Sequence, residues 1–224
     1  MRKFTILLSF LSLNLGIADL KITPSYDEES SIIKARVDFE PLKISKEGTY
    51  SIVQSDGCIY SYTPHRPRLP LKELFLLLPP NSRIKDVKII KEQEFIGEYD
   101  VVEVEEPIPI GEDRMQDTGD EEWSLFPENV AFIGEIQGCR GYSLLAINVF
   151  AGQCKEKALY WNKSINIEII LEKPKILSTP EFFRGDDEDR AFIESLVENK
   201  EIIQKYKPLK KKSSPYNLPI CNHY

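Results

Sequence analysis

The chain has 224 residues, of which 42% are hydrophobic, 29% charged and 10% aromatic. This composition is typical of a folded globular chain, and it excludes a disordered chain, a collagen, a coiled coil and a multi-span membrane protein. Lys and Arg total 29 and Asp and Glu total 36, so the formal net charge is -7. Because an acidic protein is poorly suited to a polyanion, we expect no nucleic acid as a partner.

The N-terminus has the pattern of a secretory signal. Arg2 and Lys3 precede an almost wholly apolar run at 4–17, and small residues stand before Asp19. This pattern predicts a signal peptide over residues 1–18, cleaved between Ala18 and Asp19. The apolar run is about 14 residues, whereas a bilayer-spanning helix needs about 20. We therefore expect export to the periplasm, the cell surface or the extracellular medium, with no stable membrane insertion after the signal is removed.

The body of the chain, residues 19–180, is rich in short segments of Val, Ile, Leu, Tyr and Phe separated by Pro, Gly and Asn. Such segments predict strands, and several alternate apolar and polar residues with the period of two that a half-buried strand shows. The predicted strands are 32–39, 50–53, 73–78, 84–90, 99–104, 130–136, 142–150 and 165–171. Because no helices intervene, the expected fold is mostly β, an antiparallel β-sandwich or jelly-roll-like domain.

A single helix is predicted near the C-terminus, over residues 181–206. The acidic run 186–189 suits a helix start, and apolar residues then recur at helical spacing as far as Tyr206. A terminal helix docked on the sandwich is favoured over a membrane-binding role because the chain is acidic. Residues 207–224 are rich in Lys, Pro and Ser at their start, which predicts an exposed linker.

A segment of another kind, residues 111–122, carries six carboxylates and one basic residue, Arg114. It has neither alternation nor an apolar face, so it is predicted to be an exposed loop. Asp113, Asp117 and Glu121 are weak calcium candidates, since they lack the regular spacing of a strong site. The two histidines and four cysteines form no zinc-like spacing. We therefore expect no firm metal site and no cofactor.

The four cysteines are Cys58, Cys139, Cys154 and Cys221, and three complete pairings remain open. A strand over 142–150 would hold Cys139 and Cys154 far apart, so that pair is the least favoured. The standard catalytic motifs are absent from the sequence, and Cys221-Asn222-His223 falls on a predicted tail rather than a rigid fold. No catalytic residue is predicted, and an enzyme is the least supported class.

Several motifs follow one another in a specific order along the chain. The first is Pro67-Arg68-Leu69-Pro70-Leu71, leading into Leu74-Phe75-Leu76-Leu77-Leu78-Pro79-Pro80-Asn81-Ser82-Arg83-Ile84-Lys85-Asp86-Val87. It is similar to the "x-P-x-L-P … LPPGAxVxxV" run in the propeptides of gingipain-type cysteine peptidases. Phe126-Pro127 and then the segment 139–150 look like "YPxxxV … LRGYxxxxxxxxPVQYNP". The resemblance spans about 31–218. The chain departs from the family pattern at Ala151-Gly152-Gln153-Cys154 and at Pro219-Ile220-Cys221.

The resemblance implies a β-sandwich pro-region that keeps a cognate gingipain-like cysteine peptidase domain latent and assists its folding. The family's catalytic His and Cys lie in a downstream domain that this chain does not contain. The acidic loop, with Arg114 and Met115, is then the inhibitory-loop candidate. Arg114 would either mimic a substrate side chain in an acidic pocket or simply offset its acidic neighbours. Lys210, Lys211 and Lys212 are activation-cleavage candidates.

The alternative is a stand-alone secreted β-sandwich module that binds carbohydrate or a cell-surface protein. Such a module needs an exposed aromatic platform. The candidates for it are Trp123, Tyr160 and Trp161.

Overall fold

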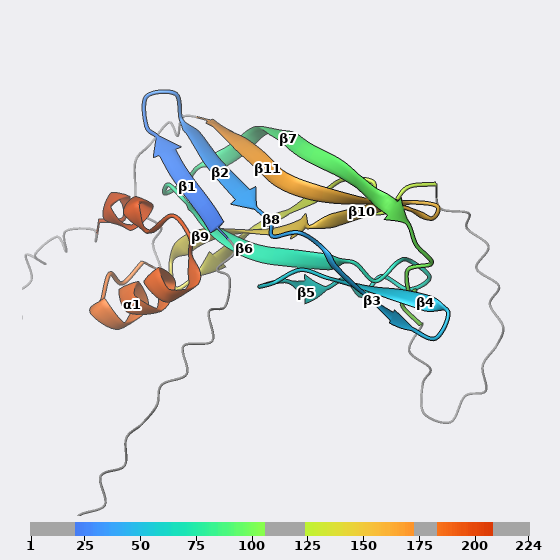
Figure 1. Ribbon diagram of the computed structural model, residues 1–224. Coiled ribbons are helices and arrows are strands. Elements are labelled where there is room, and N and C mark those ends of the chain that lie inside the picture. The colour runs from blue at the N-terminus through green and yellow to red at the C-terminus, as the bar shows by residue number, and fades with distance from the viewer. Residues whose placement is uncertain (1–20, 106–123, 173–182, 208–224) are drawn as a thin grey trace, which may run out of the picture.

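The computed structural model describes residues 21–105, 124–172 and 183–207, and it confirms a mostly-β, antiparallel fold. Two sheets pack face to face, and the helical segments lie at one end of them (Figure 1). The segments rich in β-branched and aromatic residues form the strands, as their propensity predicts.

The first sheet is organised around the long strand β11 (Ala158–Glu172). β7 (Arg83–Glu98) pairs with β11 along one side, and β10 (Gly152–Lys155) and β2 (Ile32–Asp38) follow each other along the other side. β1 (Lys21–Asp27) pairs with β2 and completes the sheet. All these pairings are antiparallel. The sheet combines β1 and β2, which come early in the chain, with β10 and β11, which come late in it.

The second sheet has the order β5-β6-β9-β8, with bounds Ile59–Tyr60, Pro70–Leu78, Tyr142–Phe150 and Ala131–Cys139. β6 and β9 pair in unbroken register from Leu71 opposite Phe150 to Leu78 opposite Ser143. A separate hairpin, β3 (Lys43–Glu47) and β4 (Tyr50–Gln54), extends the domain away from the helices (Figure 1).

The main core lies between the two sheets. Alternate residues of facing strands are almost completely buried, as their period of two requires. These residues are Ile33, Ala35 and Val37 of β2, Ile165, Ile167 and Ile169 of β11, and Leu145, Ile147 and Val149 of β9. The end of β6 breaks the alternation, because Leu76, Leu77 and Leu78 are all buried. Its outer face is covered by the C-terminal segment, so both faces are apolar.

The predicted single helix over 181–206 is wrong in its length. The chain forms α1 (Asp187–Leu196), leaves helical geometry at Val197, and continues as a 3-10 helix, η1 (Lys200–Lys205). Asn199 is fully buried between the two helices. Its amide oxygen accepts from the Leu77 backbone N–H at 2.7 Å, and its amide nitrogen donates to the Leu77 carbonyl at 2.9 Å. Helical periodicity cannot reveal a break that a distant strand imposes.

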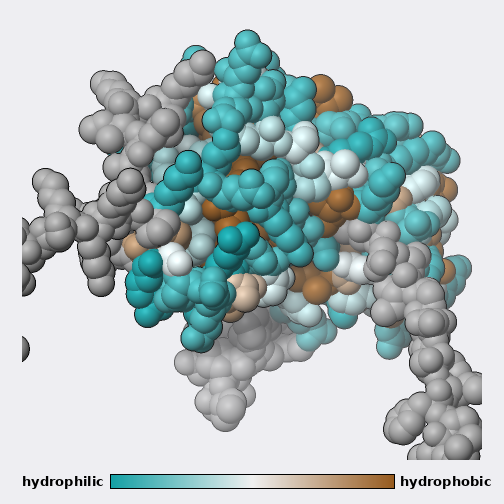
Figure 2. Space-filling model, turned by 90° about the vertical axis from the view of Figure 1, so that its left-hand side faces the viewer, coloured by the Kyte–Doolittle hydropathy of each residue, from teal (hydrophilic) through white to brown (hydrophobic). Residues whose placement is uncertain are grey.

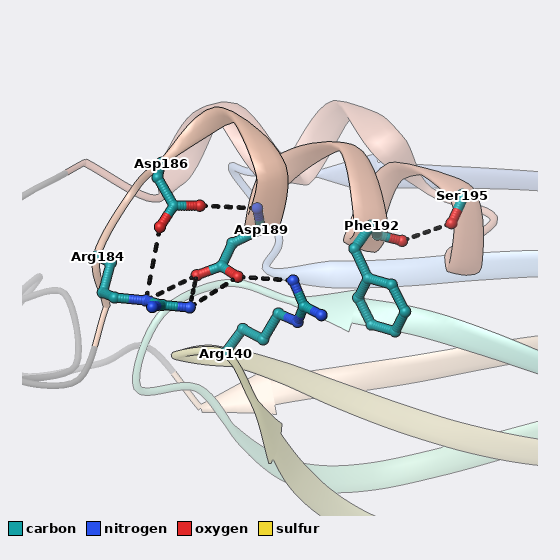
Figure 3. Close-up of polar contacts among 6 residues, drawn as sticks. All are labelled: Arg140, Arg184, Asp186, Asp189, Phe192 and Ser195. Carbon is teal, nitrogen blue, oxygen red and sulfur yellow. Dashed lines mark hydrogen bonds and ion pairs between the residues drawn. The ribbon is translucent and has the colours of Figure 1, made fainter.

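A buried carboxylate fixes the start of α1 on the β8–β9 turn (Figure 3). Asp189 is 1% exposed and accepts hydrogen bonds from Arg140 at 2.8 Å and from Arg184 at 3.0 and 3.1 Å. Asp186 caps the helix by accepting from the Asp189 backbone N–H at 2.8 Å. A buried carboxylate needs such partners, and two guanidinium groups supply them. The Arg140 guanidinium also lies over the Phe192 ring, 4.3 Å from its centroid.

The turn that presents Arg140 depends on a glycine. Arg140 and Gly141 have φ angles of 51° and 82°, the left-handed pair that a two-residue hairpin turn requires. A Cβ on Gly141 would stand 2.5 Å from the Cα of Phe183. Only glycine therefore lets the segment before α1 approach this turn.

Several strand predictions need correction. Residues 99–104 do not form a strand: Val101 and Glu103 make isolated bridges only. β1, β3, β5 and β10 were not predicted from the sequence, because they are short or contain proline and polar residues. β7 and β11 are much longer than the apolar runs from which they were predicted. Their polar stretches are also strand, because the two strands pair with each other along their length.

The end of the sandwich that carries the helices is largely hydrophilic, with small separated hydrophobic patches (Figure 2). Among the described residues, no helix is long and apolar enough to cross a membrane.

Asn199→Ala should destabilise the domain by about 1–3 kcal/mol, because it leaves the buried N–H and C=O of Leu77 without partners. Urea unfolding followed by circular dichroism measures this change. Gln204→Ala, at an exposed position of η1, is the matched control and should change stability by less than about 0.5 kcal/mol. Equal stability of the two variants would contradict the proposed role of Asn199.

Candidate functional site: the anchors of the acidic segment

A second apolar cluster, here called the anchor cluster, lies at the end of the sandwich away from the helices. It consists of Val53, Leu69, Leu71, Val101, Phe126, Phe150, Cys154 and Leu159. Val101 precedes the acidic segment and Phe126 follows it, and both are 9% exposed. The described residues on either side of the acidic segment therefore meet in one buried cluster, although 24 residues separate Val101 from Phe126 in the chain.

The stretch before the acidic segment, residues 99–105, is here called the first stalk. It runs between the start of β4 and the segment 65–68, and backbone hydrogen bonds hold it on both sides. The Ser51 N–H donates to the Asp100 carbonyl at 2.7 Å, and the Val102 N–H donates back to the Ser51 carbonyl at 3.1 Å. On the other side, the Arg68 N–H donates to the Val102 carbonyl at 2.8 Å. The first stalk is thus fixed like a strand, although its pairing is too interrupted to form one.

The stretch after the acidic segment, residues 124–130, is here called the second stalk. Phe126 and Cys154 exchange two backbone hydrogen bonds, of 2.8 and 2.7 Å. The Gln153 side chain donates to the Pro127 carbonyl at 2.6 Å, and the Phe126–Pro127 peptide bond is cis. The Phe126 ring meets the Phe150 ring edge-on, with centroids 5.9 Å apart. Backbone, side-chain and ring contacts together fix where the chain re-enters the sandwich.

Buried side chains and backbone hydrogen bonds hold the two stalks together. Bringing two stretches about 20 residues apart into contact costs about 3 kcal/mol of chain entropy, apart from a constant that does not depend on length. Burying a Val or Phe side chain contributes about 1.5–3 kcal/mol each, and the stalk hydrogen bonds add about 0.5–1.5 kcal/mol each. These contributions are of the size needed to offset the cost that grows with length.

The predicted site residues themselves fall outside the described part of the chain. They are Arg114 and Met115, the calcium candidates Asp113, Asp117 and Glu121, the aromatic Trp123, the lysines Lys210, Lys211 and Lys212, and the cleavage pair Ala18 and Asp19. What the structure brings together is the two stalks that flank residues 106–123. Among the described residues, no group of three or more His, Cys, Asp or Glu side chains could hold a metal ion.

The anchoring residues were not recognised from the sequence as functional. Phe126-Pro127 was noted only as part of a motif, and Gln153 and Cys154 only as a departure from one. The sequence does contain a signal for these anchors. Apolar residues stand before and after a highly charged segment, and such residues are expected to pack in a core.

The aromatic platform of the alternative function is not formed by the described candidates. Tyr160 and Trp161 are neighbours on β11, so their side chains point to opposite faces of the sheet. Tyr160 packs against Phe95, with ring centroids 5.6 Å apart, and Trp161 lies beside Lys163, whose ammonium is 5.7 Å from its ring centroid. The binding-module alternative therefore has no support from this pair.

The described cysteines are Cys58, Cys139 and Cys154, and all three are free thiols. Cys154 is completely buried in the anchor cluster, and burial raises the pKa of its thiol to about 12. Burial likewise raises the pKa of Cys58 to about 11. Thiols held in the protonated form are poor nucleophiles, so Cys154 acts as a small apolar residue.

Comparisons with known proteins connect this architecture to solved structures. No protein-family model matches the chain, and no curated protein matches it. One similar structure is a chain from a complex of the pro- and mature domains of RgpB from Porphyromonas gingivalis. The match has a TM-score of 0.56 and 15% identity, and covers 80% of this chain and 96% of that chain. A structure concerned with the zymogenic latency of gingipain K from Porphyromonas gingivalis matches with a TM-score of 0.55 and 14% identity. It covers 70% of this chain and 96% of that one. The chain therefore has the fold of gingipain pro-domains.

Cys154 and Cys58 should resist iodoacetamide at pH 8 in the folded protein and react readily in urea, because burial suppresses their thiolates. Peptide mapping by mass spectrometry measures both rates. A raised folded-state pKa also means that the thiols favour folding below about pH 9. This contribution is lost as the pH rises toward 11 and 12. Labelling of folded Cys154 at the unfolded rate would contradict its burial.

Proposed function

We propose that the chain is the pro-domain of a gingipain-type cysteine peptidase and that it keeps the peptidase domain latent and assists its folding. The observation that carries this proposal is the fold shared with gingipain pro-domains, which covers almost the whole length of the two matched chains. The ordered motifs of the sequence support it independently. The chain itself is not catalytic in this proposal, since the catalytic groups belong to the peptidase domain.

The anchored stalks suggest how latency is achieved. A segment held at both ends by a buried cluster loses less conformational entropy on binding than a free segment does. Residues 106–123 would enter the active-site cleft of the peptidase from this base. Arg114 is the single basic residue among the six carboxylates of 111–122, and Met115 follows it. The Arg114 guanidinium would pair bidentately with a carboxylate of an acidic specificity pocket.

Export is part of the same proposal. Residues 1–18 would direct the chain out of the cytoplasm and be removed before Asp19. The pro-domain would then meet its peptidase domain in the periplasm, at the cell surface or outside the cell.

Arg114→Ala should weaken inhibition of a gingipain-type peptidase by about 2–5 kcal/mol, because it removes one member of a desolvated charge pair. The measurement is the inhibition constant of the purified chain against mature RgpB and against gingipain K. Arg83→Ala, an exposed Arg on β7, is the matched control and should inhibit like the unmodified chain.

The two ways in which this experiment can fail are distinct. An Arg114→Ala variant that inhibits as well as the unmodified chain would eliminate the specificity-pocket role of Arg114. An unmodified chain that inhibits neither peptidase would contradict the latency function itself.

Activation should cut the chain at Lys210, Lys211 or Lys212, which follow the last described residue, Lys207. Tyr206 is 6% exposed, and its hydroxyl donates to the Leu78 carbonyl at 2.6 Å, so a cut beyond it leaves the core intact. Incubation with active peptidase and mass spectrometry of the products maps the cut. Replacing the three lysines by Ala should block it, whereas Lys46→Ala should not. A first cut within 21–105 or 124–172 would contradict this prediction.

A further inference from the structure

A network of polar side chains connects the second stalk to the edge strand β7. Its centre is Gln153, which is 2% exposed in β10. The Gln153 amide oxygen accepts from the Lys91 ammonium at 2.6 Å and from the Gln93 amide nitrogen at 2.9 Å, and both donors come from β7. The Gln153 amide nitrogen donates to the Pro127 carbonyl at 2.6 Å. One buried side chain thus joins three separate segments of the chain.

A second buried amide closes the network. Asn162 of β11 has no exposed surface; its amide oxygen accepts from Gln93 at 3.0 Å, and its amide nitrogen donates to the Phe150 carbonyl at 2.8 Å. Both buried amides are satisfied through oxygen and nitrogen. A buried network in which each amide oxygen and nitrogen has a partner resists rotation, because rotating one member would leave several buried groups without partners.

The donors and acceptors fix which way the Gln153 amide points. An ammonium group can only donate, so the oxygen of Gln153 must face Lys91. The amide nitrogen must then face Pro127, whose carbonyl can only accept. Lys91 and the Pro127 carbonyl therefore fix the same orientation of the Gln153 amide, Lys91 through its oxygen and Pro127 through its nitrogen. Desolvation lowers the pKa of Lys91, which agrees with the contact between its ammonium and the buried Gln153 oxygen.

We propose that Gln153 is the positioning residue of the second stalk and that Lys91 acts through it, so that β7 sets where the chain re-enters the sandwich after the acidic segment. The positioning is a property of the chain alone. Its consequence for inhibition rests on the proposed latency function.

Gln153→Glu separates positioning from general stability. A glutamate keeps the oxygen that Lys91 and Gln93 need, but it replaces the N–H donor by a second oxygen facing the Pro127 carbonyl. The network within the sheet should survive, whereas the second stalk should lose its side-chain bond and gain a repulsion. Lys91→Met tests the other step, because the Gln153 oxygen then loses its charged donor and keeps the neutral donor Gln93.

Hydrogen–deuterium exchange of the Phe126 and Cys154 amides measures how firmly the second stalk is held, because each amide donates to the other residue's carbonyl group. We expect at least tenfold faster exchange of the Phe126 amide in Gln153→Glu. Lys91→Met should have a smaller effect in the same direction. In both variants, protection of β9 amides such as Leu145 should stay unchanged. Lys88→Met, at an exposed position of the same strand, is the matched control and should leave all these rates unchanged.

Two results would overturn the inference. If Phe126 exchanges at the unmodified rate in Gln153→Glu, the Pro127 bond does not position the stalk. If β9 loses protection by the same factor as Phe126, Gln153 has a general structural role rather than a positioning one.

Inhibition of mature RgpB and of gingipain K tests the functional consequence separately. Gln153→Glu should raise the inhibition constant about tenfold, while Lys88→Met leaves it unchanged. If the unmodified chain inhibits neither peptidase, the latency function fails, but the exchange result still decides the positioning role. If the chain inhibits and Gln153→Glu inhibits equally well, the stalk does not control the inhibitory geometry.

Discussion

The burial of Val101 and Phe126 in one apolar cluster is the constraint on which the candidate site depends. Val101 lies before the acidic segment and Phe126 after it, and their burial in one cluster brings the two stalks together. Cys154 belongs to the same cluster as a protonated, apolar-like thiol, and its backbone is hydrogen-bonded to that of Phe126. This geometry is consistent with the proposed function, which rests on the fold shared with gingipain pro-domains.

The two ends of the sandwich hold different segments of the chain. At one end, the C-terminal segment docks through buried polar groups, with Asp189 held between two arginines and Asn199 inserted against the backbone of β6. At the other end, the anchor cluster and the Gln153 network hold the stalks. The strands β9 and β11 run from one end to the other (Figure 1) and form the rigid body that keeps the two ends apart. Cleavage beyond Tyr206 would therefore leave the proposed inhibitory base undisturbed.

Much of this architecture could be predicted from residue patterns, and what could not has a physical reason. The alternation of Ile165, Ile167 and Ile169 predicted a half-buried strand correctly, because the period of two is local information. The break at Asn199 could not be predicted, since it depends on hydrogen bonds to a strand more than a hundred residues away. The same holds for Gln153: a polar residue in a short strand has no pattern, and its role exists only through the segments folded around it.

The most direct test of the central claim is the experimental structure of this chain bound to a gingipain-type catalytic domain. We expect residues 106–123 in the active-site cleft, the Arg114 side chain paired with an acidic residue of the specificity pocket, and the second stalk held by Gln153. A complex in which this segment lies away from the cleft, or in which the two proteins contact each other only through the helical end of the sandwich, would contradict the account.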